Sequence, residues 1–111
     1  RKHLWTGLGE HFMQSEAPLA AADVRDRLLY IQAIETVRCL EENVLLSVAD
    51  ANIGSIFGIG FAAWTGGALQ FINQTGLPAF VARARYLAEQ YGERFAPPAL
   101  LLQKEVDGTL F

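Results

Sequence analysis

The glycines of residues 58–67, in the string GIGFAAWTGG, have the types and spacing of a dinucleotide-binding turn. The first six letters satisfy a pattern in which glycines let the backbone approach a pyrophosphate at the start of a helix. Such a turn needs a preceding strand, and an acidic residue about twenty residues further on to hold the ribose. The preceding residues follow a helix cap and include Gly54, and no carboxylate lies between Asp50 and Glu89. We therefore predict no NAD binding by these glycines.

Histidine and cysteine offer little further chemistry. His3 and His11 are separated by a spacing that matches no standard metal-ligand pair, so we expect surface imidazoles. Cys39 is the only cysteine, and it falls on the apolar side of a predicted helix. A single thiol forms no internal disulfide and no zinc site, which favours a packed side chain in a reducing compartment, and we expect the cytoplasm.

Glu35 is the carboxylate that most deserves a hypothesis, because it lies inside a predicted helix with few polar positions. Arg38 follows three residues later, a spacing that brings two side chains together on a helix. We favour an internal ion pair, or a hydrogen bond to loop backbone. The alternative is a catalytic acid, since perturbed carboxylates also occur in active sites.

Composition sets limits on the class of protein. The 111 residues suit one small domain, with 51% hydrophobic and 19% charged residues. The net charge of -3 and the scattered basic residues exclude a nucleic-acid-binding footprint. The chain begins Arg-Lys-His, without an initiator methionine or an apolar signal segment. We interpret it as a mature product or a piece of a longer protein.

No charged residue or histidine occurs from Ala51 to Ala82. The length invites a comparison with a membrane span, but residues 53–72 include five glycines, and no basic cluster flanks them. Gly54 and Gly58 have the spacing that lets helices approach closely, which we assign to packing in a water-soluble fold. This charge-free segment must be covered by its own domain or by a neighbour.

The elements that position these residues are predicted to be helices. We expect an irregular arm over residues 1–21, whose Leu4, Trp5, Leu8 and Phe12 tuck onto the domain. An all-α single domain of about five helices follows over residues 22–111. The expected helices cover residues 24–43, 47–58, 66–73, 78–91 and 99–107, with Asp23 as the first N-cap and Ser47 opening the second helix.

The first of these helices carries a broad apolar stripe, which predicts that it is the central helix. The stripe consists of Tyr30, Ala33, Val37, Leu40 and Val44, widened by Leu28, Ile31 and Ile34.

Three strings carry a family resemblance: VRDRLLYIQAIETVRCLEE at 24–42, ADANIGSIFGIGFAAWTGGAL at 49–69 and YGERFAPPALL at 91–101. Together they resemble the C-terminal helical domain of 3-hydroxyacyl-CoA dehydrogenases, a fold like the C-terminal domain of 6-phosphogluconate dehydrogenase. The similarity is greatest to the second, final copy of that domain in the α subunit of bacterial fatty-acid oxidation multienzymes, which join an enoyl-CoA hydratase to the dehydrogenase. The arm from Leu4 to Phe12 shares in it.

The resemblance implies that NAD and the catalytic His and Glu belong to a Rossmann domain of the parent enzyme. We therefore expect no catalytic, cofactor-binding or metal-binding residue here. Simple dehydrogenases of the family place an Asn near the substrate in an N-R-L-L string, whereas this sequence has D-R-L-L with Asp26 in that position. A carboxylate cannot donate the amide hydrogen bond, so Asp26 is predicted to be structural, together with Glu35 and Arg38. Phe61 is followed by two alanines where the simple members have proline, which leaves the turn geometry open.

The resemblance also implies partners. The tandem helical copies of the multienzymes pack on one another, so the charge-free segment is expected to dock on the preceding copy and the Rossmann domain, with the thiolase β subunit completing the complex. As an isolated fragment, the chain is expected to form a homodimer. The predicted packing residues are Phe61, Trp64, Thr65, Gly66, Gly67 and Phe71. Two alternatives stay open: a free-standing helical dimerisation or interaction module, and a domain that itself binds the CoA moiety.

Overall fold

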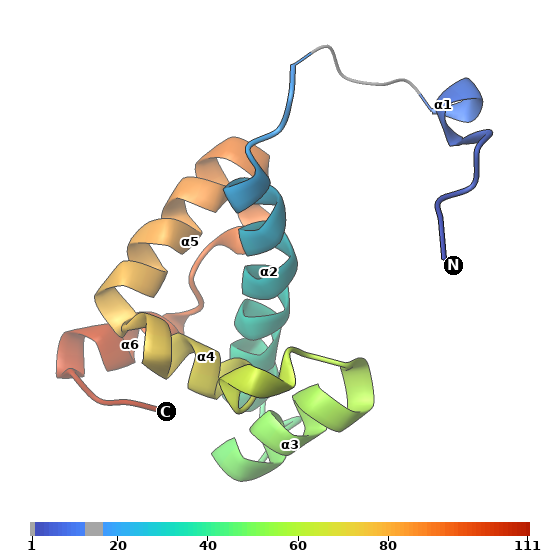
Figure 1. Cartoon of the computed structure of the whole chain (residues 1–111). Helices are drawn as coiled ribbons and strands as arrows, with labels where there is room; N and C mark the ends of the chain where they lie inside the picture. The colour runs from blue at the N-terminus through green and yellow to red at the C-terminus, as the bar shows by residue number, and fades with distance from the viewer. Residues whose placement is uncertain (1, 13–16) are drawn as a thin grey trace.

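The long helix predicted at the centre of the domain is present as α2 (Ala21–Glu41), and the later helices pack around it (Figure 1). The computed structural model describes residues 2–12 and 17–111, so Arg1 and residues 13–16 of the predicted arm lie outside the described residues. All elements within those ranges are helical, and the domain is a single all-α unit, as predicted. The remaining elements are α1 (Leu8–His11), α3 (Val48–Ile59), η1 (Ala63–Thr65), α4 (Ala68–Thr75), α5 (Leu77–Tyr91), η2 (Glu93–Phe95) and α6 (Ala99–Asp107).

Local sequence determines most helix ends. The Ser47 hydroxyl accepts a hydrogen bond from the Asp50 amide at 3.0 Å, which caps the start of α3 as predicted. Gly60 and Gly108 take left-handed conformations, with φ of 72° and 67°, immediately after α3 and α6. The end of α3 falls one residue beyond the predicted Gly58, because Gly60 provides the left-handed turn.

The ends of α2 differ from the prediction. Its N-cap is Ala20, which has no side-chain hydrogen bond to offer, and Asp23 lies inside the first turn with its side chain buried. The helix ends at Glu41 because Asn43 has a φ of 58°, and the amides of Val44 and Leu45 both donate to the Cys39 carbonyl. Asparagine is one of the few residues that adopt this left-handed conformation readily.

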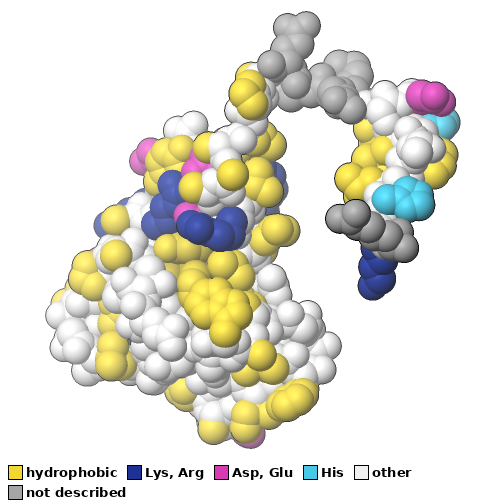
Figure 2. Space-filling model, viewed as in Figure 1, with side chains coloured by type: hydrophobic (Ala, Val, Ile, Leu, Met, Phe, Trp, Pro, Cys, Tyr) yellow, Lys and Arg dark blue, Asp and Glu magenta, His cyan; other side chains and the backbone are white. Residues whose placement is uncertain are grey.

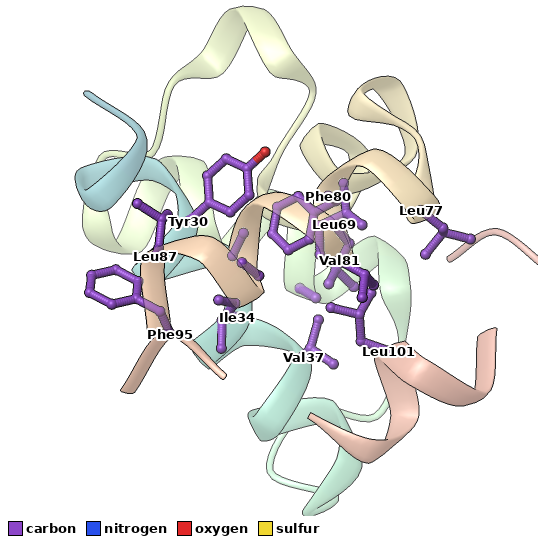
Figure 3. Close-up of a cluster of buried hydrophobic side chains, with 14 residues drawn as sticks. Tyr30, Ile34, Val37, Leu69, Leu77, Phe80, Val81, Leu87, Phe95 and Leu101 are labelled. Atoms are coloured by element: carbon purple, nitrogen blue, oxygen red, sulfur yellow. The ribbon is translucent and has the colours of Figure 1, made fainter. Parts of the chain in front are cut away.

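The core forms where α2, α4, α5 and α6 meet (Figure 3). The ring of Tyr30 stacks on that of Phe80, with centroids 4.2 Å apart and planes 5° from parallel, and Phe71 contacts both rings edge-on. The predicted stripe is buried at its centre but not at its ends, since Leu28 and Val44 are 63% and 68% exposed. The buried cluster comprises Tyr30, Ala33, Ile34, Val37, Ala51, Leu69, Ile72, Leu77, Phe80, Val81, Ala84, Leu87, Phe95 and Leu101.

Helix α4 is capped by side chains of α3 and not by its own N-cap residue. The Asn52 Oδ1 atom accepts hydrogen bonds from the amides of Leu69 and Gln70, at 2.9 and 3.1 Å. The Ser55 hydroxyl accepts a third from the Ala68 amide at 3.0 Å. Three of the amides that a helix start leaves unpaired are thus satisfied across an interhelical contact.

Replacing Asn52 with leucine is expected to lower the free energy of unfolding by about 1–2 kcal/mol, because two buried amides lose their acceptor. Asn52→Asp is the matched variant, since a carboxylate keeps the acceptor and favours a helix N-terminus. Urea denaturation monitored by circular dichroism measures both. Equal losses for the two variants would show that Asn52 contributes through packing and not through capping.

The N-terminal arm does not cover the domain in this structure. Helix α1 stands apart from the other helices in Figure 1, and the core cluster includes no arm residue. The side chains expected to tuck inward are exposed by 80%, 58%, 44% and 64% at Leu4, Trp5, Leu8 and Phe12. The core is closed without them because α5 and α6 occupy the positions around α2.

The charge-free segment is divided among α3, η1, α4 and the start of α5. In the described part of the chain, none of the helices combines the length and apolar character needed to cross a bilayer.

Candidate functional site

A group of five polar side chains, called here the polar cluster, joins the start of α2 to α5: Asp23, Asp26, Arg83, Tyr86 and Tyr91. The Arg83 guanidinium lies between the two carboxylates, with Nη2 2.6 Å from Asp23 Oδ1 and Nε 2.8 Å from Asp26 Oδ2. Asp23 and Asp26 on α2, and Arg83 and Tyr86 on α5, are each three residues apart, so each pair lies on one face of its helix.

The second oxygen of Asp23 completes the cluster. Asp23 Oδ2 accepts hydrogen bonds from the hydroxyls of Tyr91 and Tyr86, at 2.7 and 3.0 Å. The guanidinium carbon of Arg83 lies 4.7 Å from the centre of the Tyr86 ring, and that of Arg27 lies 4.4 Å from the centre of the Tyr91 ring. Asp23 is only 7% exposed. Its carboxylate accepts from Arg83, Tyr86 and Tyr91, and these hydrogen bonds form a polar contact between α2 and α5.

These contacts shift the ionisation of the cluster in opposite directions. The hydrogen bonds from Tyr91 and then Arg83 lower the pKa of Asp23 below its ordinary value, against the opposing effect of burial. The same hydrogen bonds to the Asp23 carboxylate raise the pKa of Tyr86 and of Tyr91. Nearby in the core, burial and then the charge of Asp26 raise the pKa of Tyr30 to about 12. The cluster therefore holds an ionised carboxylate and two neutral phenols over a wide pH range.

Stability is expected to fall at both pH extremes. The pKa of Asp23 is lowered in the folded state, so its ionisation stabilises the folded chain. This contribution to the free energy of unfolding is present above about pH 4 and is lost as pH falls through the lowered pKa. The raised pKa values of Tyr86 and Tyr91 give a contribution that is present below about pH 10 and is lost as pH rises through them. Urea denaturation at pH 3, 7 and 11 measures the two losses.

The matched variants for this experiment are Asp23→Asn and Asp107→Asn. The first removes the ionised acceptor, so it should be less stable at pH 7 and should lose less on acidification. The second changes an exposed aspartate of α6 and should leave the acid dependence unchanged. If Asp23→Asn and the unsubstituted chain lose the same stability between pH 7 and pH 3, the linkage to Asp23 is wrong.

The predicted structural residues are all engaged in ion pairs. Asp26 pairs with Arg83 and, through its other oxygen, with Arg25 at 3.1 Å. Arg38 Nη1 lies 3.0 Å from Glu35 Oε2, but the Glu35 side chain is 61% exposed. The predicted ion pair thus exists at the surface and not inside the domain, because this side of α2 borders an open groove.

Arg38 has a second role that its sequence position did not reveal. Its Nη2 atom donates to the backbone carbonyls of Arg94 and Ala96, at 3.2 and 3.3 Å. It thereby holds the turn containing η2 against α2.

The six predicted packing residues are divided by the structure. Phe61 and Thr65 are 3% and 0% exposed within their own domain, which leaves them no surface for a partner. Phe71 is half-buried against Phe61 and the core rings. The assignment of Phe61 and Thr65 as partner contacts is corrected, because both side chains are used inside the domain, where the Thr65 hydroxyl donates to the Ala62 carbonyl. Phe71 keeps part of its surface exposed and stays a predicted contact.

The two glycines of the W-T-G-G string form the corner between η1 and α4. Gly66 has a φ of 80° and stays exposed. Gly67 has a φ of 118° and is buried, and a Cβ atom placed on it would lie 2.5 Å from the Asn52 Cβ. Both glycines thus act in the turn itself.

Trp64 is the one predicted packing side chain that is largely exposed, at 77%. It borders a shallow hollow of about 330 Å³ that Asp26, Tyr30 and Phe71 also line. Helix α3 adds Ile53, Phe57 and Ile59, exposed by 58%, 86% and 63%. These four residues are referred to as the exposed apolar residues of α3 and η1.

Figure 2 shows the resulting contrast on one face of the molecule, where charged side chains gather over the upper part of the helical body and hydrophobic side chains lie directly below them. Within the described ranges, no group of three His, Cys, Asp or Glu side chains is placed to hold a metal ion. No protein-family model matches the sequence.

Proposed function

We propose that this chain is a helical docking domain of a fatty-acid β-oxidation multienzyme, whose parent chain has NAD-dependent 3-hydroxyacyl-CoA dehydrogenase and enoyl-CoA hydratase activity. The observation that carries the proposal is the set of exposed apolar residues of α3 and η1. Four large apolar side chains exposed by more than half on one short segment are costly in water and are typical of a surface that a partner covers. The three strings that resemble the dehydrogenase helical domain indicate which partner to expect.

On this proposal the preceding helical copy and the Rossmann domain of the parent chain cover Trp64 and its neighbours, and NAD stays with the Rossmann domain. The thiolase subunit joins the complex, which operates in the cytoplasm. The fold proposed for the domain is that of the C-terminal domain of 6-phosphogluconate dehydrogenase.

Asp26 supports a structural role for the domain. Both of its carboxylate oxygens accept from arginine, so it holds α2 to α5, and a carboxyl group lacks the amide N–H with which an asparagine would donate to a thioester oxygen. The proposal accordingly places acyl-CoA chemistry on other parts of the parent chain.

The isolated chain tests the docking surface. Size-exclusion chromatography with light scattering should show concentration-dependent self-association, because the apolar residues then have only another copy to cover them. Trp64→Ser and Phe57→Ser should each weaken it. Leu46→Ser is the control, since Leu46 is 84% exposed but lies in the loop between α2 and α3. A strictly monomeric chain at high concentration, or equal effects of all three variants, would contradict the proposed surface.

A second measurement tests the enzymatic context. The product of the complete reading frame should reduce NAD with a 3-hydroxyacyl-CoA. Trp64→Ser should weaken the contact between this domain and its neighbouring domains in that protein without abolishing NAD binding. Absence of the activity, combined with dimerisation of the isolated chain, would instead establish a free-standing interaction module. Heat released on titrating acyl-CoA into the isolated chain would favour the CoA-binding alternative.

A further inference from the structure

Two apolar grooves lie one after the other along α2. The α2–α3 groove, between these two helices, has a volume of about 440 Å³. The α2–η2 groove, nearer the start of α2, has a volume of about 320 Å³. Ile31 lines both, so the two grooves are continuous and are called here the α2 depression. From Val24 to Cys39 the depression follows about 22 Å of α2, the length of a helix of about fifteen residues.

The residues of α2 that line the depression have the spacing of a helix-packing seam. Val24, Leu28, Ile31 and Glu35 follow one another at intervals of four, three and four residues. This is the heptad spacing with which one helix packs along another. Val24 and Leu28 are 40% and 63% exposed, so the described chain leaves the start of this seam uncovered.

The charged side chains of the α2–η2 groove are Arg27 on α2 and Arg94 on η2. The guanidinium carbon of Arg27 lies 4.4 Å from the centre of the Tyr91 ring, and that of Arg94 lies 5.0 Å from the centre of the Phe95 ring. In the part of the chain that the structure describes, neither guanidinium pairs with a carboxylate. Both are therefore held against an aromatic ring and have N–H groups free for an anion.

The charges of the α2–α3 groove are already neutralised or hydrogen-bonded. Its charged residues are Glu35 and Asp50. Glu35 pairs with Arg38 at 3.0 Å. Asp50 accepts from the Ser47 hydroxyl at 2.8 Å. The unpaired charge of the α2 depression is thus positive and lies at the end near the start of α2.

A helix suits this depression better than an extended peptide. A helix satisfies its own backbone hydrogen bonds, whereas an extended segment needs partners along its length. The hydroxyl groups that line the α2–α3 groove cannot donate to such a segment, because Thr36 and Ser55 each donate to a backbone carbonyl of their own helix. The heptad seam of α2 also matches the spacing of a second helix.

We propose that the α2 depression binds an amphipathic helix of another protein, whose apolar side chains lie along the seam and whose carboxylates pair with Arg27 and Arg94. The inference goes beyond the proposed function, because neither Phe57 nor Trp64 lines either groove. Of the exposed apolar residues of α3 and η1, Ile59 borders the α2–α3 groove. The chain thus has two docking surfaces that meet at this residue.

Fluorescence anisotropy of labelled helical peptides tests the site on the whole chain. The first probe is a peptide of about eighteen residues with leucines at heptad spacing and glutamates beside them in its first two turns. The second has a lysine in place of each glutamate, and the third has the residues of the first in scrambled order. Each is used at nanomolar concentration. The glutamate probe should bind, the lysine probe should bind about tenfold more weakly, and the scrambled probe should not bind.

Charge reversal tests the role of the arginines. Arg94→Glu, at an exposed position, should weaken binding of the glutamate probe by about tenfold and strengthen binding of the lysine probe. Arg85→Glu is the matched control, since Arg85 is exposed on α5 and lines neither groove. Circular dichroism checks that each variant keeps its helices.

A second pair of variants tests the apolar seam. Leu28→Ser should weaken binding of both charged probes, because it removes an exposed apolar contact at the centre of the α2–η2 groove. Leu46→Ser is the control, since Leu46 is even more exposed but lies outside both grooves. Trp64→Ser should leave the affinity unchanged, which separates this surface from the one in the proposed function.

Three results would overturn the inference. One is no binding of the glutamate probe at millimolar chain concentration, and another is equal affinity for the glutamate and lysine probes. The third is binding of the glutamate probe that Arg94→Glu leaves unchanged. Binding of the chain to vesicles containing phosphatidylserine, lost in Arg94→Glu, would assign the arginines to a membrane surface instead. Self-association without any probe binding would contradict this inference and leave the proposed function standing.

Discussion

Replacing Gly67 with alanine is expected to lower the free energy of unfolding by about 3 kcal/mol. The backbone at Gly67 has a φ of 118°, a conformation that residues with a side chain rarely adopt. The added methyl group would also lie 2.6 Å from the Asn52 Cα atom, and a backbone atom cannot rotate away as a side chain does. The corner between η1 and α4 would have to open, which would separate Asn52 from the amides it caps.

Gly58→Ala is the matched control for this prediction. Gly58 lies within α3, and a Cβ atom placed there would meet nothing within 4 Å. Alanine favours a helix over glycine, so this variant should be more stable by about 0.5–1 kcal/mol. Thermal and urea denaturation of both variants measure the difference. A Gly67→Ala variant as stable as the unsubstituted chain would show that the corner adjusts at little cost.

Replacing Phe80 with alanine is expected to lower the free energy of unfolding by about 3–5 kcal/mol. Phe80 is fully buried at the meeting of α2, α4 and α5, where its ring stacks on Tyr30 and contacts Phe71 edge-on. Truncation removes both ring contacts and leaves a cavity whose walls are held by other buried side chains. Because the free energy of unfolding of a small domain is only about 5–15 kcal/mol, this variant should lose a large part of it.

Leu28→Ala tests whether burial causes that loss. Leu28 belongs to the apolar stripe of α2, as does Tyr30, on which Phe80 stacks, but Leu28 is 63% exposed, so its truncation should cost much less. Chemical denaturation with a common slope for both variants gives the comparison. Similar losses at Leu28 and Phe80 would mean that the stripe, and not the ring stack, determines the stability of α2.

Some of the helix ends could be predicted, namely those that depend on local chemistry. Ser47 caps the helix that follows it, and the helices expected to end at residues 91 and 107 do end there, immediately before Gly92 and Gly108. Each of these residues caps or ends a helix that begins or ends within a few positions of it in the sequence.

The polar cluster could not be predicted, because its partners are far apart in the sequence. Asp23 has the residue type and position of an N-cap, and the helix forms three residues earlier with its carboxylate turned toward Arg83, sixty positions away. The pairs Asp23 with Asp26 and Arg83 with Tyr86 have helical spacing, which indicates a shared face on each helix. Nothing in either pair says that α2 and α5 are neighbours.

The sequence also could not predict which of the expected packing residues are buried inside the domain and which are exposed. Phe61 and Trp64 lie three positions apart in an apolar string, and the sequence gives both the same partner-facing role. Phe61 turns inward onto Phe71, whereas Trp64 stays at the surface, because the chain passes from an irregular turn into η1 between them. Only the tertiary path of that turn separates the two side chains.

The capping of α4 by Asn52 and Ser55 has a consequence for the dynamics of the domain. The amides of Ala68, Leu69 and Gln70 can exchange with solvent deuterium only when α3 moves away from α4, since their acceptors belong to α3. The two helices should therefore open together, with one common exchange rate at the start of α4. They behave as one cooperative unit, although a corner of two glycines lies between them in the chain.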